Sequence, residues 1–316
     1  MKICVAGQGA FGIKHLEAIA NIGGIEVVSL AGGNPAGTEE VAKRFSIPHW
    51  TTNLAESLAQ PGVEAAILTT PTQMHADQAE QCMRAGKHVM VEIPMADSLK
   101  DSERLVRVQK ETGLVAMAGH TRRFNPSHQW IRKRILSGEL KILAMDVQTF
   151  FFRRTNMNAA GKPRSWTDHL LWHHACHTVD LFQYQTGETA HRANGLQGPI
   201  HPELKIAMDM SIQLKVPSGA VCTLALSFNN KGPIGTFFRY ICDNGTYIAR
   251  YDDLVDGDQQ PIDLSKVAVS MNGIELQDRE FFAAIKEGRE PNASVRQCLS
   301  AMQTLDRLEK SLEANP

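Results

Sequence analysis

Four histidines lie close together in the second half of the chain, and their spacing indicates acid–base chemistry. They are His169, His173, His174 and His177, at one end of a helix predicted over 169–185, out of twelve histidines in the whole chain. Imidazole titrates near neutral pH, which suits a general acid or base. His173 and His177 are four residues apart, so a helix places them on one face.

A metal site, as in a metal-dependent hydrolase or lyase, is the alternative interpretation of this cluster. His169 and His177 would lie about 12 Å apart along an α-helix, which is too far to bind one ion. A closer pair, such as His173 with His177, would need a third ligand from elsewhere, and the chain has no H-E-x-x-H motif. We therefore predict an acid–base site and no metal.

A glycine-rich turn, Gly7-Gln-Gly-Ala-Phe-Gly12, follows the first predicted strand and leads into the first predicted helix. The glycines permit a tight turn, a close approach of the backbone to a pyrophosphate and close helix–strand packing, and the helix N-terminus offers free amides to the phosphates. In this context the motif predicts a dinucleotide cofactor. The predicted contacts are Gly7, Gly9, Ala10, Phe11 and Gly12.

The residues after the second predicted strand, 25–31, bear on the choice between NAD and NADP. NAD-specific sites usually carry an acid here, whereas this chain has Gly32-Gly33-Asn34 and neither a carboxylate nor an arginine. Gly33, Asn34 and Thr38 could accept a 2′-phosphate through free amides and small polar groups. We predict NADP, with NAD as the alternative.

The elements that must position these residues divide the chain in two. Over the first 120 residues, apolar strands alternate with helical segments, which is typical of a parallel sheet covered on both faces. These strands are expected at 3–6, 25–31, 65–69, 88–92 and 114–118, and the helices at 12–22, 38–45, 75–86 and 98–112. The later strands and helices are expected at 126–136, 142–153, 169–185, 207–215, 219–229, 236–242, 245–251, 275–287 and 294–313.

This pattern predicts an α/β protein: a Rossmann dinucleotide-binding domain over 1–120, and over 121–316 an α+β substrate and dimerisation domain. Several long strands after one helix indicate an open, mainly antiparallel sheet with one covered face, and the C-terminal helix closes the chain.

Composition excludes several classes of protein. The chain has 316 residues, 33 basic and 34 acidic side chains, and 43% hydrophobic residues. A formal charge of −1 argues against a nucleic-acid binder, and no apolar run approaches the roughly 20 residues that span a bilayer. Six scattered cysteines without a C-x-x-C pair, and no signal-peptide pattern, indicate the cytoplasm.

Five motifs together resemble the Gfo/Idh/MocA oxidoreductase family over nearly the whole chain. They are the glycine turn at 7–12 and the segments 69–75 (TTPTQMH), 86–94 (GKHVMVEIP), 119–126 (GHTRRFNP) and 177–180 (HTVD). The resemblance implies a Rossmann domain and an antiparallel-sheet domain whose open face carries the substrate and often the dimer contact. It also implies further cofactor contacts, which would come from Thr70, Pro71, His75, Glu92 and Pro94.

The chain departs from the family pattern at two catalytic positions. The usual E-K-P motif reads Glu92-Ile93-Pro94, so its lysine is missing, and the usual aspartate of D-x-G-x-H-x-x-D is His173. Of the family's lysine, aspartate and histidine, His177 alone is kept. The resemblance therefore makes His177 the first candidate for the general base and His173 the second.

Four segments, 119–127, 151–158, 164–177 and 198–204, more narrowly resemble one bacterial branch of this family, which acts in the 4,5-cleavage of protocatechuate. The implied reaction oxidises the cyclic hemiacetal of a dicarboxylated semialdehyde to 2-pyrone-4,6-dicarboxylate and passes the hydride to NADP. A hemiacetal hydroxyl is more acidic than a sugar hydroxyl, so a histidine could replace the missing lysine as base.

Two substrate carboxylates require cations, and arginine suits them because its guanidinium pairs with a carboxylate through two parallel hydrogen bonds. Arg153 and Arg154 would point to opposite faces of a strand, so one of them at most can line the site. The predicted substrate-binding residues are His120, Arg122, Arg123, Arg153, Arg164, Trp166, His169 and His174.

Two other functions remain open for the sequence. One is a sugar or inositol dehydrogenase of the same family, and the other is a non-catalytic NADP(H)-binding regulator. A homodimer is expected from the family resemblance.

Overall fold

The computed structural model describes residues 1–157, 161 and 168–314, and these form two units. The first unit contains Met1–Thr121 and Ile274–Leu299, and the second contains Arg122–Gly273 and the chain from Ser300. The sequence placed the whole of 121–316 in the second domain, but Ile274–Leu299 packs with the first unit instead. In the described part of the chain, no helix is long and apolar enough to cross a membrane.

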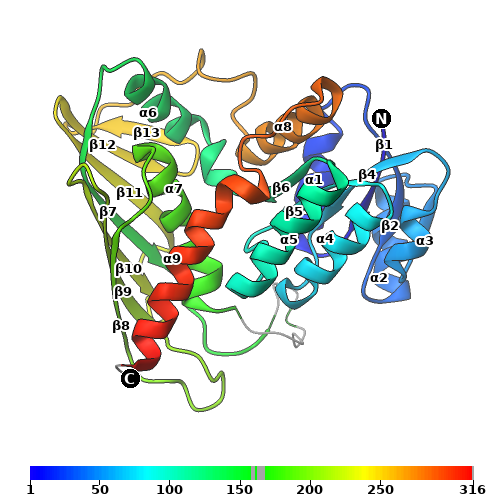
Figure 1. The fold of residues 1–316 in the computed structure, drawn as a ribbon, viewed down its shortest axis with the longest axis horizontal. Coiled ribbons are helices and arrows are strands. Elements are labelled where there is room, and N and C mark those ends of the chain that lie inside the picture. Colours follow the sequence, from blue (N-terminus) through cyan, green and yellow to red (C-terminus); the bar gives the residue numbers. More distant parts are fainter. Residues whose placement is uncertain (158–160, 162–167, 315–316) are drawn as a thin grey trace. The chain divides into compact units, whose positions relative to one another are not determined.

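The first unit is built on a six-stranded, wholly parallel sheet in the order β3-β2-β1-β4-β5-β6. Its strands are β1 (Lys2–Ala6), β2 (Glu26–Ala31), β3 (His49–Thr51), β4 (Val63–Leu68), β5 (His88–Glu92) and β6 (Ala116–Gly119). Its helices are α1 (Ala10–Ile19), α2 (Pro35–Arg44), α3 (Leu54–Leu58), α4 (His75–Arg84), α5 (Leu99–Thr112) and α8 (Gly273–Glu287), with short 3₁₀ turns at Thr72–Met74 and Thr121–Arg123. Figure 1 shows α4 and α5 side by side over one face of this sheet.

This strand order reverses direction between β1 and β4, and ligands of open parallel sheets bind at the carboxyl ends of the strands at such a point. The central strands are apolar and fully buried, as Ile3, Val5 and Ile67 illustrate. The predicted parallel sheet is therefore confirmed, and the glycine turn follows β1 at the switch point.

The second unit contains a seven-stranded sheet in the order β13-β12-β11-β7-β10-β9-β8. Its strands are β7 (Ile142–Phe150), β8 (Arg192–Gln197), β9 (Asp209–Lys215), β10 (Val221–Ser227), β11 (Gly235–Cys242), β12 (Gly245–Arg250) and β13 (Asp253–Asp256). Its helices are α6 (Pro126–Leu136), a π-helix (Leu170–Ala175), α7 (Cys176–Thr186) and the greater part of α9 (Val295–Ala314). Every neighbouring pair is antiparallel except β7 with β10.

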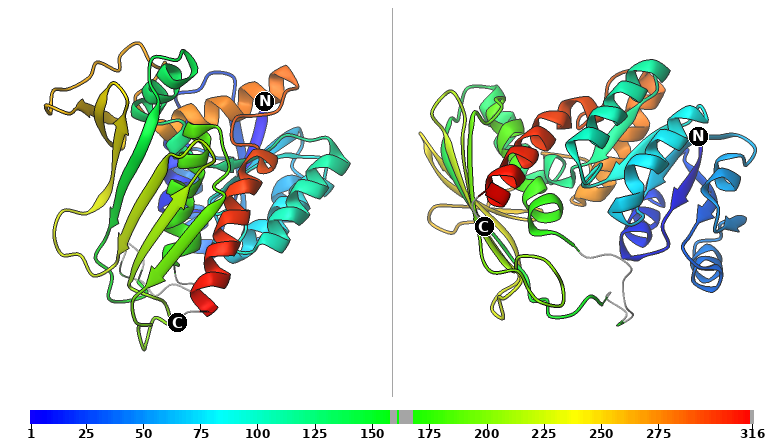
Figure 2. Two further views of the ribbon diagram at one scale, coloured as in Figure 1. Left: turned by 60° about the vertical axis from the view of Figure 1, so that its left-hand side comes forward. Right: turned by 60° about the horizontal axis from the view of Figure 1, so that its bottom comes forward.

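Strand periodicity leaves one face of this sheet covered and the other open. In β9 and β10, buried residues such as Leu214 and Cys222 alternate with exposed ones such as Gln213 and Thr223. Figure 2 shows α7 and α9 gathered on one face of the sheet. The predicted open, mainly antiparallel sheet is confirmed.

The predicted single helix over 169–185 is wrong in its first turns. Residues 170–175 form a π-helix, and the α-helix begins only at Cys176 and ends before Gly187, whose φ is 71°. The helical spacing used to relate His169 to His177 therefore does not hold, because His169 lies at the N-cap outside the helix. Single turns of π-helix are rare and frequently occur at functional sites.

Candidate active site

The glycine turn of the first unit is packed tightly at two glycines and open at the third. A Cβ at Gly12 would overlap the carbonyl oxygen of Gly7, and one at Gly7 would overlap Thr69, so neither position tolerates a side chain. A Cβ at Gly9, by contrast, would meet no atom within 4 Å, so a ligand can approach this N-cap of α1. The amides at the start of a ten-residue helix then face an anion. These residues fit a dinucleotide.

The loop after β2 is organised differently from the sequence-based expectation. Asn34 caps α2 by accepting from the amide of Gly37 at 2.9 Å, and the buried Thr38 hydroxyl donates to the carbonyl oxygen of Asn34 at 2.5 Å. Gln8 reaches across and accepts from the amide of Gly33 at 2.8 Å. The Thr38 hydroxyl is thus used within α2, whereas Asn34 uses its Oδ1 as a cap and keeps its Nδ2 as a donor.

The loop after β4 is tied down by a buried histidine. His75 Nδ1 lies 2.8 Å from the carbonyl oxygen of Pro94, and its Nε2 lies 2.8 Å from that of Thr70. Burial lowers the pKa of His75. The ring links the start of α4 to two segments, so the predicted cofactor contacts Thr70, Pro71 and Pro94 belong to one fixed arrangement.

A buried ionic cluster surrounds Glu92 at the end of β5. His15 Nε2 donates to Glu92 Oε1 at 3.1 Å, and His15 Nδ1 donates to the two oxygens of Asp278 at 2.9 and 3.1 Å. Burial alone would lower the pKa of His15, but the charge of Asp278 and the hydrogen bonds to both carboxylates outweigh it and raise the pKa to about 10. Burial raises the pKa of Asp278. At Glu92 burial also raises the pKa, but the hydrogen bond and charge of His15 together with the hydrogen bond from Gln277 outweigh it, and the pKa is lowered.

This cluster predicts a loss of stability in alkaline solution. The folded protein keeps the His15 proton up to a pKa of about 10, whereas the unfolded chain releases it near 6.5, so the contribution is complete below 6.5 and is lost between these values. We expect the free energy of unfolding to fall by about 1.4 kcal/mol per pH unit from this group across pH 7–9.5. Urea unfolding at several pH values measures the slope.

His15→Gln should remove the contribution of His15 to the fall in the free energy of unfolding with pH. His88→Gln is the matched control, because burial lowers the pKa of His88 and its titration falls below the tested range. An equal alkaline slope in His15→Gln and the wild type would contradict the assignment of a buried imidazolium.

The four predicted histidines of the second unit lie in an otherwise buried segment. Over 168–180 every residue is buried except His169, His173, His174 and His177, which are partly exposed. His169 Nδ1 accepts from the amide of Leu171 at 3.2 Å and so caps the π-helix, while burial lowers its pKa. The π-helix thus contains His173 and His174, with His169 as its N-cap and His177 in the first turn of α7.

Two phenylalanines and an Arg–Asp ion pair lie beside His174. The rings of Phe151 and Phe228 each lie 5.2 Å from its ring, and Asp168 Oδ2 lies 4.0 Å from its Nε2. Asp168 also forms a short ion pair with Arg153, whose guanidinium lies 4.9 Å from the centre of the Phe228 ring. Asp168 and the two phenylalanines were missed by the sequence analysis, because only folding brings β7, β10 and the π-helix together.

Arg153 combines burial with an unused donor. Its side chain is 16% exposed, Nη2 binds Asp168, and the buried Nη1 has no hydrogen-bond partner among the described residues. Its neighbour Arg154 is exposed, lies 4.6 Å from the Phe152 ring and donates to Asn229 at 2.6 Å. The two arginines therefore make different contacts, but β7 ends at Phe150, so the predicted strand does not reach them and its alternation does not apply.

The other predicted cations are less available. Arg123 is buried and donates two hydrogen bonds to Asp180, at 2.8 and 2.6 Å, which anchors it to α7 one turn beyond His177. Arg122 lies 4.9 Å from the Tyr251 ring, and its Nη1 is 3.4 Å from Asn125. His120 is fully buried after β6 in the first unit. Arg164 and Trp166 lie outside the described residues.

Two family models and one close relative establish the ancestry of the chain. Residues 1–120 match a model described as the oxidoreductase family with an NAD-binding Rossmann fold, and residues 126–268 match one described as bacterial oxidoreductases, C-terminal. A protein of Sphingobium sp. (strain NBRC 103272 / SYK-6), 4-carboxy-2-hydroxymuconate-6-semialdehyde dehydrogenase, is 64% identical over 313 residues, which cover 99% of each chain.

The chain belongs to the Gfo/Idh/MocA oxidoreductase family. It is an oxidoreductase that uses a nicotinamide cofactor. This member is also 31% identical to scyllo-inositol 2-dehydrogenase (NAD(+)) of Bacillus subtilis, but over only 44% of this chain and 41% of that one. Levoglucosan dehydrogenase in complex with NADH shares its fold, with a TM-score of 0.86 and 20% identity, covering 99% and 98% of the two chains.

The family's missing lysine has no polar replacement at its own position. Ile93 is 9% exposed and apolar. The partly exposed histidines of the second unit remain candidates for proton transfer.

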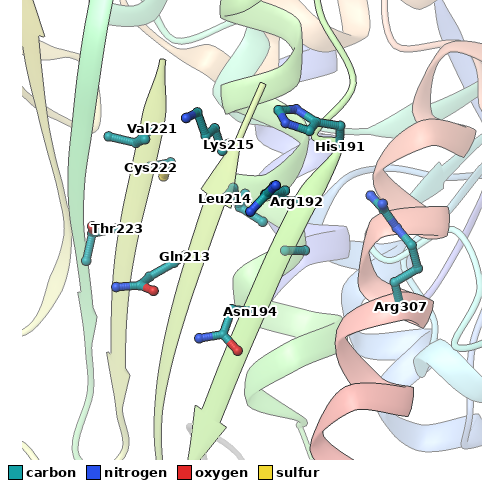
Figure 3. Close-up of a pocket in the computed structure, with 11 residues that line it drawn as sticks. His191, Arg192, Asn194, Gln213, Leu214, Lys215, Val221, Cys222, Thr223 and Arg307 are labelled. Carbon is teal, nitrogen blue, oxygen red and sulfur yellow. The ribbon is translucent and has the colours of Figure 1, made fainter. Parts of the chain in front are cut away.

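A separate hollow of about 670 Å³ lies across β8, β9 and β10 of the second unit (Figure 3). It includes the basic side chains of Arg192, Lys215 and Arg307 but none of the predicted catalytic or substrate-binding residues. Gln213 and Thr223 line it from the exposed side of the sheet. The hollow is therefore not part of the candidate acid–base site.

Proposed function

We propose that this enzyme oxidises the cyclic hemiacetal of 4-carboxy-2-hydroxymuconate-6-semialdehyde to 2-pyrone-4,6-dicarboxylate, with NADP as hydride acceptor, in the 4,5-cleavage of protocatechuate. The observation that carries the proposal is the 64% identity over 99% of both chains with a dehydrogenase named for this semialdehyde. The loss of the family lysine at Ile93 favours this more acidic hydroxyl over a sugar or inositol hydroxyl.

In the proposed mechanism, His177 removes the proton from the hemiacetal hydroxyl, and the hydride leaves the carbon that bears this hydroxyl. The nicotinamide, when bound, supplies the two-electron acceptor, and the hemiacetal carbon becomes the lactone carbonyl of the pyrone. His173, four residues before His177, relays or shares the proton. Both histidines are partly exposed, so a substrate and solvent can reach them.

Arg153 is the side chain best suited to a substrate carboxylate. Asp168 fixes its guanidinium, Phe228 lies against it, and its buried Nη1 is a donor that no other described residue satisfies. A carboxylate on Nη1 would gain a charge-assisted hydrogen bond at a site already partly removed from water. His174, with Phe151 and Phe228 beside it, would flank the ring of the substrate, and His169 would border it.

In the first unit, the glycine turn would hold the cofactor's pyrophosphate, and the ends of β4 and β5 would hold its nicotinamide half through Thr70, Pro71, Glu92 and Pro94. The absence of any acid over 32–38 supports NADP, because a 2′-phosphate would meet no negative charge there. The side-chain Nδ2 of Asn34 is the group that would receive it, because Asn34 uses its Oδ1 to cap α2.

We also propose a cytoplasmic homodimer. All six cysteines are buried free thiols, as in proteins of reducing compartments. The exposed side of the second unit's sheet carries Leu196, Val221 and Ile241, which are 65%, 41% and 39% exposed and would suit a second copy of the chain.

The test is a comparison of substrates and cofactors at 340 nm. We expect substrate-dependent reduction of NADP with the hemiacetal at a kcat/KM at least about a hundredfold above that with myo-inositol or glucose, and a slower reaction with NAD. Activity with the polyols alone would replace the proposed substrate. Binding of NADPH without turnover of any of these substrates would instead indicate a regulator.

A further inference from the structure

Glu92 uses its two carboxylate oxygens differently. Its Oε1 accepts from His15 Nε2 at 3.1 Å and from Gln277 Nε2 at 3.2 Å. Among the described residues Oε2 receives no hydrogen bond, although the side chain is only 10% exposed. A Cβ at Gly119, on the neighbouring strand β6, would lie 2.5 Å from Oε1, so a glycine there leaves room for the anchored carboxylate.

The groups that hold Oε1 are themselves fixed from behind. His15 and Asp278 are fully buried, and the carboxylate of Asp278 orients the imidazole by accepting at Nδ1. Gln277 accepts from the Thr121 hydroxyl at 2.9 Å, which directs its amide nitrogen toward Glu92. His15 and Gln277 thus hold the carboxylate of Glu92 from two sides at the carboxyl end of β5.

A buried carboxylate without such support would take up a proton, because burial penalises the charged form. A protonated carboxyl is no longer restricted to accepting hydrogen bonds, so its recognition of a hydroxyl group is less defined. The imidazolium of His15 compensates the charge, and it lies in α1, the helix that begins in the glycine turn. The same helix therefore connects the two ends of the cofactor-binding surface in the first unit.

We propose that His15 and Asp278 are positioning residues for Glu92, which keep it ionised with Oε1 bound inside the protein and Oε2 left to accept from a ribose hydroxyl of the nicotinamide cofactor. This inference rests on the cofactor and is independent of the proposed substrate. Its experiment is therefore done without substrate.

The experiment is a double-mutant cycle in cofactor affinity, measured by calorimetric titration of NADPH. Glu92→Gln and His15→Gln should each raise Kd by about ten- to a hundredfold, the range for a lost hydrogen bond to a charged group. Because His15 acts through Glu92, the double variant should bind no more weakly than Glu92→Gln alone. A purely structural role for His15 would give losses that multiply.

Thermal unfolding of each variant verifies that it folds. Asp278→Asn provides a second cycle with Glu92→Gln in case His15→Gln does not fold, and it should raise Kd less, because His15 keeps its contact with Glu92. His88→Gln, at the opposite end of β5, should leave Kd unchanged. Multiplicative losses, or an unchanged Kd in both His15→Gln and Asp278→Asn, would overturn the inference, whatever substrate the enzyme uses.

Discussion

His177→Asn should lower the turnover number by about 10²- to 10⁴-fold at saturating substrate and NADP, the range for loss of a general base. Asparagine keeps a hydrogen-bonding side chain of similar size but cannot take up the hemiacetal proton. The Kd for NADPH should stay within about twofold, because the glycine turn and the Glu92 cluster do not involve this residue. Steady-state kinetics together with cofactor titration measure both quantities.

Two further variants test whether this loss of turnover is specific to His177. His173→Asn should cost less than His177→Asn if His173 only relays the proton. His201→Asn is a matched control elsewhere in the second unit, since His201 Nδ1 only accepts backbone amides in a turn, a role asparagine can fill. Turnover within threefold of wild type in His177→Asn would remove this histidine as the base, and a larger loss in His173→Asn would transfer the role to His173.

Arg153→Lys should raise KM for the dicarboxylate by about ten- to a hundredfold while lowering kcat much less, because the lost interaction binds the ground state and the transition state alike. Lysine can still pair with Asp168, but it lacks the second donor that Nη1 provides. Initial rates over a range of substrate concentrations separate the two constants.

Arg154→Lys is the control for this experiment, since it makes the same substitution one residue later, on an exposed side chain. Its KM should equal that of the wild type. If Arg154→Lys raised KM as much as Arg153→Lys, general charge attraction rather than a bound carboxylate would explain the effect. An unchanged KM in Arg153→Lys would assign the carboxylate to another cation.

Local patterns were sufficient to predict most of the fold. Buried strands rich in valine, isoleucine and alanine predicted the parallel sheet, and alternation in β9 and β10 predicted the half-covered one. The strands that were missed, β3, β8 and β13, are short or polar strands at sheet edges, as the sequence RANGLQ of β8 shows. Such strands are defined by their neighbours rather than by their own hydrophobicity.

The sequence predicted which types of residue form the candidate site. It predicted less well which of these side chains contact one another. The glycine turn and His177 follow from motifs, but the π-helix before α7 does not, because its extra residue per turn depends on tertiary packing. His15 and Asp278 are 263 residues apart, so no local pattern connects them. The sequence also does not show that Arg123 is paired with Asp180. Only the folded structure shows this ion pair and so distinguishes Arg123 from Arg153.

The most direct test of the account is the product of the reaction. Purified enzyme is incubated with the hemiacetal and NADP, and the products are followed by absorbance at 340 nm and by mass spectrometry. We expect one 2-pyrone-4,6-dicarboxylate for each NADPH formed, and at least about a hundredfold less product in His177→Asn over the same time. Reduction of NADP without this pyrone, or no reduction of either NADP or NAD, would contradict it.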